Sequence, residues 1–168
     1  MPVLTRLVLS SAFILAICLT ALAQAPAWER YENARFGFRI ELPLGQFAPE
    51  TPSDNGDGIS LSEVGGQGQI DVFGSYNVDD SDLGALAALL ENSERVREVT
   101  YRARGRSWLV LSGYYADQGA GDIIFYAKFM FNADRSAVSA LEVSYPRAEK
   151  DRYDAIVTRL EKSLSAPA

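Results

Sequence analysis

The sequence contains no histidine and a single cysteine, Cys18, among its 168 residues. Without histidine the chain cannot form a Ser-His-Asp triad, a Cys-His catalytic pair or a zinc site with histidine ligands. Cys18 lies in an amino-terminal segment that we expect to be removed, and the remaining chain can then contain no disulfide. We therefore expect a domain that is stabilised by side-chain packing and that holds no metal and no other cofactor.

The amino-terminal residues have the three parts of a secretory signal, namely a positive charge, an apolar run and a site of small residues. Arg6 supplies the charge, residues 7–19 form the apolar run, and Ala21-Leu22-Ala23 is the predicted cleavage site. An uncleaved membrane anchor is the alternative, because a run of about 17 apolar residues is the shortest that spans a membrane. Polar residues within the run, and the absence of a basic segment after it, favour cleavage after Ala23.

Lipid attachment to Cys18 is a second alternative for this segment. A lipoprotein signal has a small residue directly before the cysteine, whereas Ile17 is bulky and further apolar residues follow Cys18. Residues 1–23 are therefore a predicted signal peptide, and residues 24–168 a single globular domain. We expect this domain to be periplasmic or secreted, without stable insertion in a membrane.

The charge balance of the predicted domain is acidic. Arg6 is the only charged residue of the predicted signal, so 15 of the 16 basic residues remain against 22 acidic ones. A chain of this charge is a poor partner for nucleic acids and anionic lipid surfaces unless it carries a local basic patch. We therefore expect no nucleic-acid partner.

Apolar residues that alternate with polar ones predict an antiparallel sheet. In residues 36–42 every second residue is apolar, and Pro43 ends the run. The glycine-rich segment 65–68 predicts a hairpin turn between two further strands. Residues 47–53 show no such alternation and are expected to be irregular. The predicted strands are residues 28–31, 36–42, 59–64, 69–76, 96–103, 108–115, 123–131 and 137–145.

Two segments have the three- and four-residue spacing of apolar residues that is typical of a helix. The first is expected to begin at residues 79–81, where acidic side chains favour the positive end of the helix dipole. The second follows Pro146 and closes the domain. The buried stripe is expected to contain Leu83, Leu86, Leu89 and Leu90 in the first helix, and Tyr153, Ile156, Val157, Leu160 and Leu164 in the second.

This order of elements predicts an α+β fold, in which a mid-chain helix and a C-terminal helix sandwich an antiparallel sheet of about six or seven strands. Residues 123–131 are apolar at nearly every position, so we expect this strand to be covered on both faces. The residues expected in the core are Phe38, Ile40, Phe125, Phe129, Leu141, Val143, Ile156 and Leu160.

Motifs near the two ends of the predicted domain point to a known family. Tyr31-Glu32-Asn33 leads into residues 36–43, an aromatic-glycine-aromatic strand that ends in proline, and Val143-Ser144-Tyr145-Pro146 precedes the helix at 153–164. With the order of elements, these motifs resemble the PsbP-like fold family of lumenal photosystem subunits and exported bacterial proteins. The resemblance implies a binding or assembly subunit without catalysis. The metal-linked histidines of the photosynthetic members have no counterpart here, which puts any metal role in doubt.

Three arginines form the first candidate contact surface. Arg102, Arg104 and Arg106 are two positions apart and are expected to project from one side of an extended segment, opposite Tyr101 and Ala103. Such a row of guanidinium groups suits a carboxylate or phosphate partner, because arginine binds these anions through paired hydrogen bonds. Pairing with nearby glutamates at a solvated strand end is the alternative.

Three tyrosines form the second candidate. Tyr114, Tyr115 and Tyr126 lie near the glycine-containing loop 116–122 and are candidates for the rim of a binding surface. Tyrosine suits interfaces because it combines an apolar ring with a polar hydroxyl. Core packing with the hydroxyl at the surface is the alternative.

Catalytic arrangements have weaker support. Lys128 lies on an apolar strand and could serve a Ser-Lys dyad, although snorkelling at a sheet edge is the commoner arrangement. Residues 54–58 superficially resemble a calcium loop, but glycines occupy two of the ligand positions, so we interpret them as a turn. Paired carboxylates could serve a glycoside hydrolase, although loops and a helix start explain most of them better. The available carboxylates are Glu63, Asp71, Asp79, Asp80 and Asp82.

Together these observations favour an exported, non-catalytic binding or assembly module of the bacterial envelope, whose partner is an unknown protein or a small anionic ligand. A small carboxylate-dependent hydrolase and a purely structural envelope protein are the alternatives. Two carboxyl groups that face each other across a deep cleft, roughly 5–9.5 Å apart, would favour the hydrolase. A shallow surface with aromatic and arginine clusters would favour the binding module.

Overall fold

The computed structural model describes residues 27–50, 53–116 and 122–168. The predicted signal peptide, with Cys18 and the cleavage site after Ala23, lies outside the described residues, as does most of the loop 116–122. Within the described ranges, no helix is long and apolar enough to cross a membrane.

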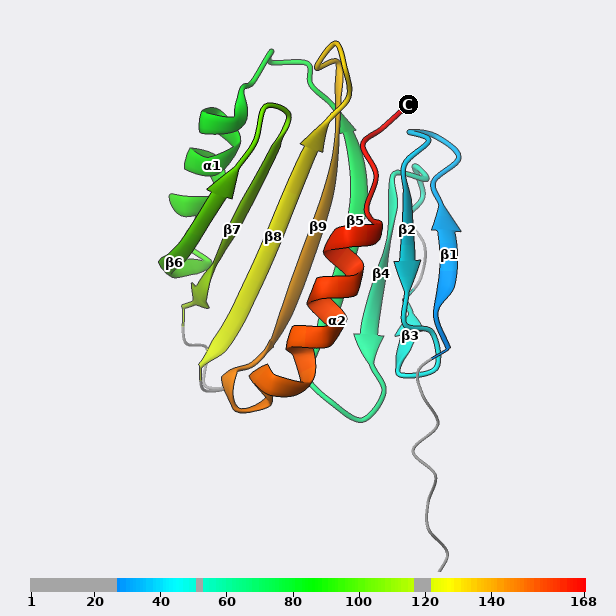
Figure 1. Ribbon diagram of the computed structural model, residues 1–168, viewed down its shortest axis with the longest axis vertical. Coiled ribbons are helices and arrows are strands. Elements are labelled where there is room, and N and C mark those ends of the chain that lie inside the picture. The colour runs from blue at the N-terminus through cyan, green and yellow to red at the C-terminus, as the bar shows by residue number, and fades with distance from the viewer. Residues whose placement is uncertain (1–26, 51–52, 117–121) are drawn as a thin grey trace, which may run out of the picture.

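The described residues form an antiparallel sheet, a separate hairpin and two α-helices, which confirms the expected α+β fold (Figure 1). Seven strands pair in the order β3-β4-β5-β9-β8-β7-β6, and β1 and β2 form the hairpin. The strands are β1 (Glu29–Glu32), β2 (Arg39–Leu42), β3 (Phe47–Pro49), β4 (Gly58–Glu63), β5 (Gln69–Tyr76), β6 (Val96–Arg104), β7 (Trp108–Tyr115), β8 (Ile123–Phe131) and β9 (Ala137–Pro146). The helices are α1 (Leu83–Glu91), a short 3-10 turn at Arg147–Glu149 and α2 (Lys150–Ser163).

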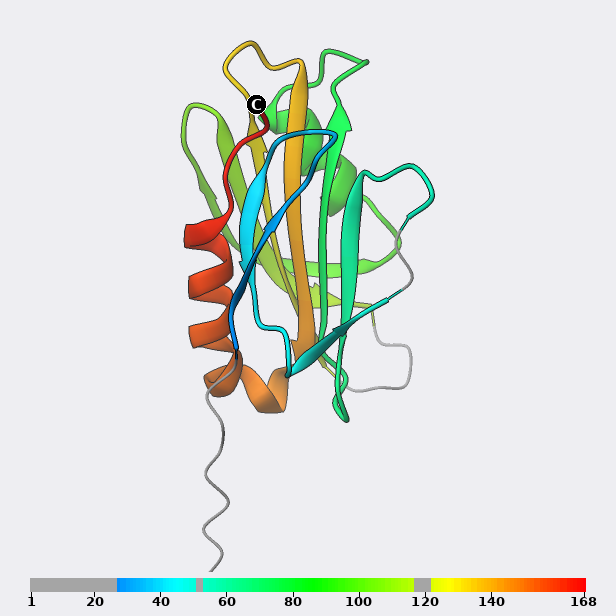
Figure 2. The same cartoon turned by 90° about the vertical axis from the view of Figure 1, so that its right-hand side faces the viewer.

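The two helices lie on opposite faces of the sheet and over different strands (Figures 1 and 2). On one face α1 packs against β6 and β7, and on the other α2 contacts β8 and β9 and also the hairpin strand β2. We call these the α1 face and the α2 face. Because each helix covers only part of its face, the α1 face is open over β4, β5 and β9, and the α2 face is open over β6 and β7.

The larger hydrophobic core lies on the α2 face. Side chains from the hairpin, from β4, β5 and β9 and from α2 meet there, and Phe38, Leu141 and Leu160 are completely buried. The predicted core residues are confirmed as buried, except that Phe129 is half-buried at the margin of the α1 face. Strand β8 contributes to the cores of both faces, as its apolar sequence predicts.

The smaller core lies on the α1 face, and here part of the sequence interpretation is wrong. Of the α1 side chains only Leu90 is buried, with Leu83 and Leu86 packed at its side, whereas Leu89 is 74% exposed. Helix α1 is apolar on nearly every side, so the spacing of its leucines does not define which one faces the sheet.

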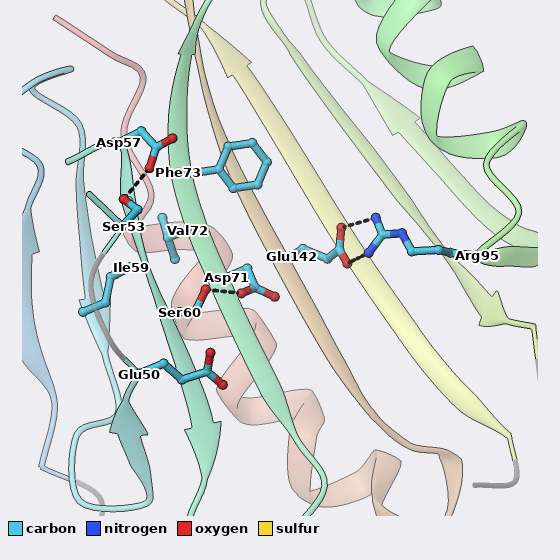
Figure 3. A pocket seen from close by; sticks show the side chains of 11 residues that line it. Glu50, Ser53, Asp57, Ile59, Ser60, Asp71, Val72, Phe73, Arg95 and Glu142 are labelled. Carbon is cyan, nitrogen blue, oxygen red and sulfur yellow. Dashed lines mark hydrogen bonds and ion pairs between the residues drawn. The ribbon is translucent and has the colours of Figure 1, made fainter. Parts of the chain in front are cut away.

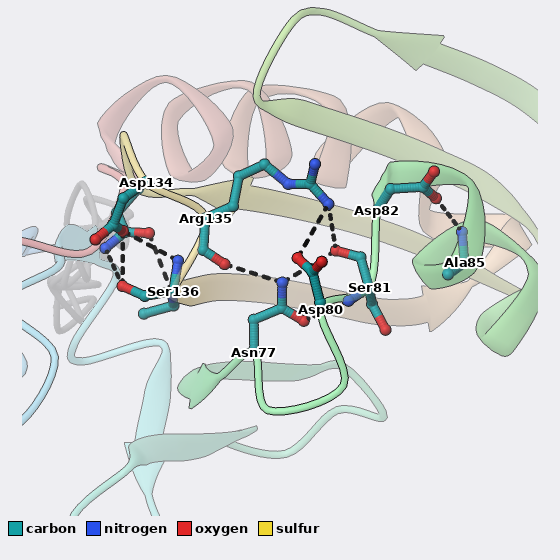
Figure 4. A network of polar contacts seen from close by, with 10 residues as sticks. Asn77, Asp80, Ser81, Asp82, Ala85, Asp134, Arg135 and Ser136 are labelled. Atoms are coloured by element: carbon teal, nitrogen blue, oxygen red, sulfur yellow. Dashed lines mark hydrogen bonds and ion pairs between the residues drawn. The ribbon is translucent and has the colours of Figure 1, made fainter.

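Helix α1 also begins later than predicted, at Leu83 rather than at residues 79–81. Asp80 has a left-handed φ of 47°, which ends the preceding turn, and the Asp82 carboxylate caps the helix by accepting a hydrogen bond from the Ala85 amide at 2.8 Å. Figure 4 shows how Asn77 connects this turn to the β8–β9 turn: its side-chain amide donates to the carbonyls of Ser81 at 3.0 Å and Arg135 at 2.9 Å.

The β1–β2 hairpin is closed by a turn that the Tyr31-Glu32-Asn33 motif encodes. The buried Asn33 side chain accepts from the Phe36 amide at 2.8 Å and donates to the Gly56 carbonyl at 3.0 Å, so β2 begins only after this turn. Gly37 has a φ of +71°, a conformation that favours glycine. The carboxy-terminal segment then holds the hairpin, since the Ala168 amide donates to the Phe36 carbonyl at 2.9 Å.

Strand β3 corrects the prediction that residues 47–53 are irregular. Phe47–Pro49 pair with β4 at the edge of the sheet, and the Phe47 side chain is buried in the α2-face core. Pro49 explains why the pattern was hidden, because proline is tolerated at an edge strand but weakens a strand signal in the sequence. Residues 51 and 52 of the predicted segment lie outside the described residues.

Candidate functional site

A groove lined by aromatic side chains runs along the open part of the α2 face. It consists of two adjoining cavities of about 570 Å³ and 320 Å³, which share Tyr101, Tyr126, Val157 and Thr158. Strands β6 to β8 form its floor and α2 forms one wall. We call it the tyrosine groove. Its aromatic residues are Tyr101, Trp108, Tyr114, Tyr126 and Tyr145.

The exposed aromatic surface of the groove comes chiefly from the edge strand. Tyr101 is 54% exposed, whereas Tyr145 is buried and stacks flat on Tyr153 with ring centroids 4.2 Å apart. Burial raises the pKa of Tyr145 to about 12, so its hydroxyl stays protonated. Tyr145 therefore forms a buried part of the groove lining next to β8, whereas the ring of Tyr101 is accessible to solvent.

The charged groups along the α2 wall pair with one another. The Tyr126 hydroxyl donates to the Glu161 carboxylate at 2.6 Å, and the Lys128 ammonium donates to the Glu161 carbonyl at the same distance. Burial raises the pKa of Tyr126, reinforced by Glu161, and lowers the pKa of Lys128, whose side chain is 14% exposed. The expectation that Lys128 lies at a sheet edge is wrong, because β8 lies between β7 and β9. The Lys128 side chain instead extends toward Glu161 near the end of α2.

One end of the groove carries stacked arginines. The guanidinium groups of Arg97 and Arg147 lie 5.2 Å and 5.6 Å from the centre of the Tyr114 ring, and both pair with the Asp122 carboxylate, at 2.9 Å and 3.1 Å. The hydrogen bonds from Arg97 and Arg147 lower the pKa of Asp122. This arrangement packs two cations against the Tyr114 ring, and the Asp122 carboxylate offsets part of their charge.

A polar pocket lies on the open part of the α1 face (Figure 3). Asp71 on β5 and Glu142 on β9 are direct cross-strand partners and project side by side from the sheet. Glu50 and Ser60 line the pocket on the β4 side of this pair, and Arg95 lies on the side of Glu142. The cavity has a volume of about 340 Å³. We call it the carboxylate pocket.

The two central carboxylates of the carboxylate pocket have different surroundings. Burial raises the pKa of Asp71 although Ser60 donates a hydrogen bond to it at 2.5 Å, and the nearby Glu142 and Glu50 charges add to the increase. Glu142 accepts two hydrogen bonds from the Arg95 guanidinium, at 3.1 Å and 3.4 Å, and another from the Tyr115 hydroxyl. Glu142 is therefore held by a cation and a hydroxyl, whereas Asp71 has only neutral donors.

The structure divides the three candidate tyrosines between the two faces. Tyr114 and Tyr126 lie together in the tyrosine groove, but Tyr115 points to the other face, where it stacks on Phe125 with centroids 4.9 Å apart. Successive strand residues face opposite sides of a sheet, so Tyr114 and Tyr115 cannot share one rim. The predicted rim is wrong in this respect.

The arginine row lies on the edge strand and the turn that follows it. Arg102 forms an ion pair with Glu91 of α1 at 2.8 Å, as the alternative of local pairing anticipated, and Arg104 and Arg106 are exposed. Register places Arg102 on the α1 face and Tyr101 on the α2 face, in agreement with the expected alternation. The row therefore runs beside α1 and does not line the tyrosine groove.

Of the remaining candidate carboxylates, Glu63, Asp80 and Asp82 have structural partners. Glu63 lies under α2, where it accepts hydrogen bonds from the Tyr153 hydroxyl at 2.8 Å and pairs with Arg152 at 2.6 Å. Asp57, in the turn at 54–58, accepts a hydrogen bond from Ser53 at 2.6 Å. Among the described residues, no group of three or more histidine, cysteine or acidic side chains is placed to hold a metal ion. Asp79, Asp80 and Asp82 all lie in or next to the turn before α1.

Sequence reasoning did not connect Trp108, Tyr145 and Tyr101 with a site, nor Glu142 with Asp71. Alternation along β7 would have placed Trp108 on the same face as Tyr114, six positions away. The pairing of β5 with β9, which brings Asp71 and Glu142 together, joins segments about 70 positions apart and leaves no local signal.

Comparisons with solved structures show the fold. No family model matches the chain, and no curated protein sequence matches it. The cyanobacterial PsbP (CyanoP) of Synechocystis sp. PCC 6803 has a similar structure, with a TM-score of 0.57 and 13% identity over 94% of this chain and 98% of that one. The Ran-binding protein Mog1p of Saccharomyces cerevisiae has a TM-score of 0.58 and 10% identity over 84% and 96% of the two chains.

A third similar structure is LpqN of Mycobacterium tuberculosis, described as involved in cell envelope biogenesis, with a TM-score of 0.53 and 13% identity over 84% of this chain and 91% of that one. Because these identities are low, the likeness establishes the architecture and not a shared activity. The resemblance to the PsbP-like fold that the terminal motifs indicated is confirmed.

Proposed function

We propose that this chain is an exported, non-catalytic binding or assembly module of the bacterial envelope. The observation that carries the proposal is the tyrosine groove, in which the half-exposed Tyr101 lies beside Tyr126 and Trp108 on the sheet. Tyrosine and tryptophan dominate binding energy at protein interfaces, because each contributes a large contact area for little loss of side-chain freedom.

The similar structures support this proposal through what their names state. Mog1p is a Ran-binding protein, and LpqN is involved in cell envelope biogenesis. One fold therefore serves a protein that binds another protein and a protein of a cell envelope. The predicted signal peptide at residues 1–23 supports export of this chain.

The carboxylate pocket is the specific observation that favours the alternative, a small hydrolase. Asp71 and Glu142 have surroundings that differ, as acid and base groups in enzymes do. However, the two side chains extend from neighbouring strands of one sheet, side by side, and not from two walls that could enclose a scissile bond. Their geometry supports a binding surface better than a catalytic cleft.

The proposed function can be tested by site-specific photo-crosslinking in the cells that produce the protein. A benzoylphenylalanine in place of Tyr101 should yield a discrete crosslinked adduct in the envelope fraction. Tyr76 is the matched control, because it is also a tyrosine with 54% exposure but lies beside Phe36, away from the groove. Absence of an adduct at Tyr101, or equal adducts at both positions, would contradict a binding function of the groove.

Export requires its own measurement. The mass of the purified envelope protein should correspond to a chain that begins at Gln24 without lipid. A mass that includes Cys18 with acyl chains would show a lipoprotein instead.

A further inference from the structure

We infer that the tyrosine groove binds an extended, proline-containing segment of a partner protein. This inference rests on the proposed binding function and specifies the chemistry of the partner. Its first support is the length of the groove: Trp108 and Tyr114 lie at opposite ends of it, six positions apart on β7. At about 3.3 Å per residue of a strand they are about 20 Å apart. A polyproline II segment rises about 3.1 Å per residue, so six or seven residues fill this length.

The second support is the charge of the groove. The charged side chains that line the groove are paired within the protein: Lys150 with Asp154 at 2.8 Å, and Glu161 with Lys128 at 3.9 Å. At the Tyr114 end, Arg97 and Arg147 both pair with Asp122. A charged ligand would have to displace one of these partners or enter an aromatic surface without compensation. A segment without charge has neither penalty, so the groove selects a neutral partner.

The third support is the match between aromatic rings and prolines. Grooves lined by aromatic side chains recognise polyproline II segments, because the rings pack on the pyrrolidine rings and the ligand is already extended before binding. Proline has no amide proton, so such a segment offers mainly carbonyl acceptors. The hydroxyl of the half-exposed Tyr101 can donate to these carbonyls, whereas the Tyr126 hydroxyl already donates to Glu161.

The edge strand beside the groove argues against the other extended ligand, an added β-strand. The pairing of β6 with β7 shifts register twice, between Val96 and Glu98 and between Val99 and Tyr101. Such bulges, and charged residues such as Arg102 and Arg104, are features that protect sheet edges from pairing with another chain. The ligand is therefore held by side chains of the groove rather than by the backbone of β6.

The test uses the processed protein, labelled with nitrogen-15, and an octaproline peptide with blocked ends. The peptide should shift the amide signals of Tyr101 and Ser112 and the indole signal of Trp108, with saturation below millimolar concentration. Tyr101→Ser should weaken binding about tenfold or more, as loss of an aromatic anchor does. Tyr76→Ser should leave the affinity unchanged. Both tyrosines are half-exposed, so we expect the two variants to have similar thermal midpoints. A cooperative unfolding transition in each variant would show that both are folded.

Three other results would overturn the inference. If octaproline shifts no groove signal but a neutral oligosaccharide such as chitotetraose shifts those of Tyr101 and Trp108, the ligand is a glycan, and the proposed binding function stands without the peptide. If octaproline has no effect while crosslinking at Tyr101 still yields an adduct, the partner belongs to a different class. Failure of both the peptide and the crosslink would overturn the proposed function as well.

Discussion

The two faces of the sheet differ in how their helices are held. On the α2 face, Tyr153, Ile156, Val157 and Leu160 of α2 are all buried in a core that also includes the β1–β2 hairpin. On the α1 face, α1 buries Leu90 alone and leaves Leu89 exposed. The difference shows that a helix with one apolar stripe is oriented by its own sequence, whereas a helix that is apolar all round is oriented by the neighbours it meets.

The largest effect is expected in the α2-face core. Phe38→Ala should lower the free energy of unfolding by about 3–5 kcal/mol, because it removes a completely buried ring from a core that cannot collapse fully around the cavity. Phe73→Ala, in the open part of the α1 face, is the control and should cost about 0.5 kcal/mol or less. Urea denaturation followed by tryptophan fluorescence measures both. A similar cost for the two variants would contradict the assignment of the core.

A pair of adjacent leucines tests the orientation of α1. Leu90→Ala should cost about 2–5 kcal/mol, whereas Leu89→Ala should change the free energy of unfolding by about 0.5 kcal/mol or less, since only Leu90 is buried. Helix propensity changes equally in the two variants, so the difference between their urea midpoints reports burial. Reversal of the two values would mean that α1 is rotated on the sheet.

An acid-dependent contribution is expected from the contact between α2 and the β4–β5 hairpin. Burial opposes ionisation of Glu63, but hydrogen bonds from Arg152, Tyr153 and the Gly68 amide outweigh it and hold the pKa below its ordinary value of 4.5. The stabilisation by ionised Glu63 is therefore complete above pH 4.5, and it is lost as the pH falls through the lower pKa of the folded state.

The corresponding variant is Glu63→Gln, which should cost about 1.5–3 kcal/mol at neutral pH, the usual contribution of hydrogen bonds to a charged group. The cost should shrink as the pH falls below 4.5. Glu29→Gln, an exposed change on β1, is the control. Thermal unfolding across the acid range measures both, and a cost for Glu63→Gln that does not vary with pH would exclude its titration as the cause.

The smallest effect is expected in the carboxylate pocket, where the substitution should stabilise the protein and not destabilise it. Because the pKa of Asp71 is raised, the folded state is favoured while Asp71 is protonated, and stability falls as the pH rises from the ordinary value of 3.8 through the pKa of the folded state. Asp71→Asn keeps an oxygen acceptor for Ser60 and removes the charge opposite Glu142. It should stabilise the protein at neutral pH by about 0.2–1 kcal/mol.

The gain should disappear below pH 3.8, where Asp71 is itself protonated. Thermal midpoints of the two proteins at neutral pH and below pH 3.8 measure this change. Ser75→Ala, on the same strand and face but exposed, is the control for a change in strand propensity. A loss of stability on Asp71→Asn at neutral pH would show that the ionised carboxylate is favourable in the folded state.

Local sequence patterns predicted which strands and helices exist better than they predicted where each one begins and ends. The alternation in residues 36–42 predicted a strand, yet the Asn33 turn shortens it, because the side chain of Asn33 provides hydrogen bonds that replace those of a ladder. The stripe on α2 was predicted residue by residue. Phe47–Pro49 was missed, since a three-residue edge strand with a proline has no alternation to detect.

The candidate site was predicted only in part. Tyr114 and Tyr126 were identified as binding candidates, but they share the groove with Trp108 on the same strand as Tyr114 and with Tyr101 and Tyr145 on two other strands. Tyr115 was grouped with them because it is adjacent in sequence, although adjacent strand residues face opposite sides. The signal peptide at residues 1–23 remains a prediction.

The sequence by itself determined the α+β class, most strands, the stripe of α2 and the exclusion of histidine-dependent chemistry, because composition and periodicity are local properties of a chain. Only the tertiary structure decided that β5 pairs with β9, that α1 and α2 cover different strands, and that a groove and a pocket are left open on opposite faces. These features depend on contacts between residues far apart in the chain, whose energies are set by the packing of the whole sheet and have no local signal.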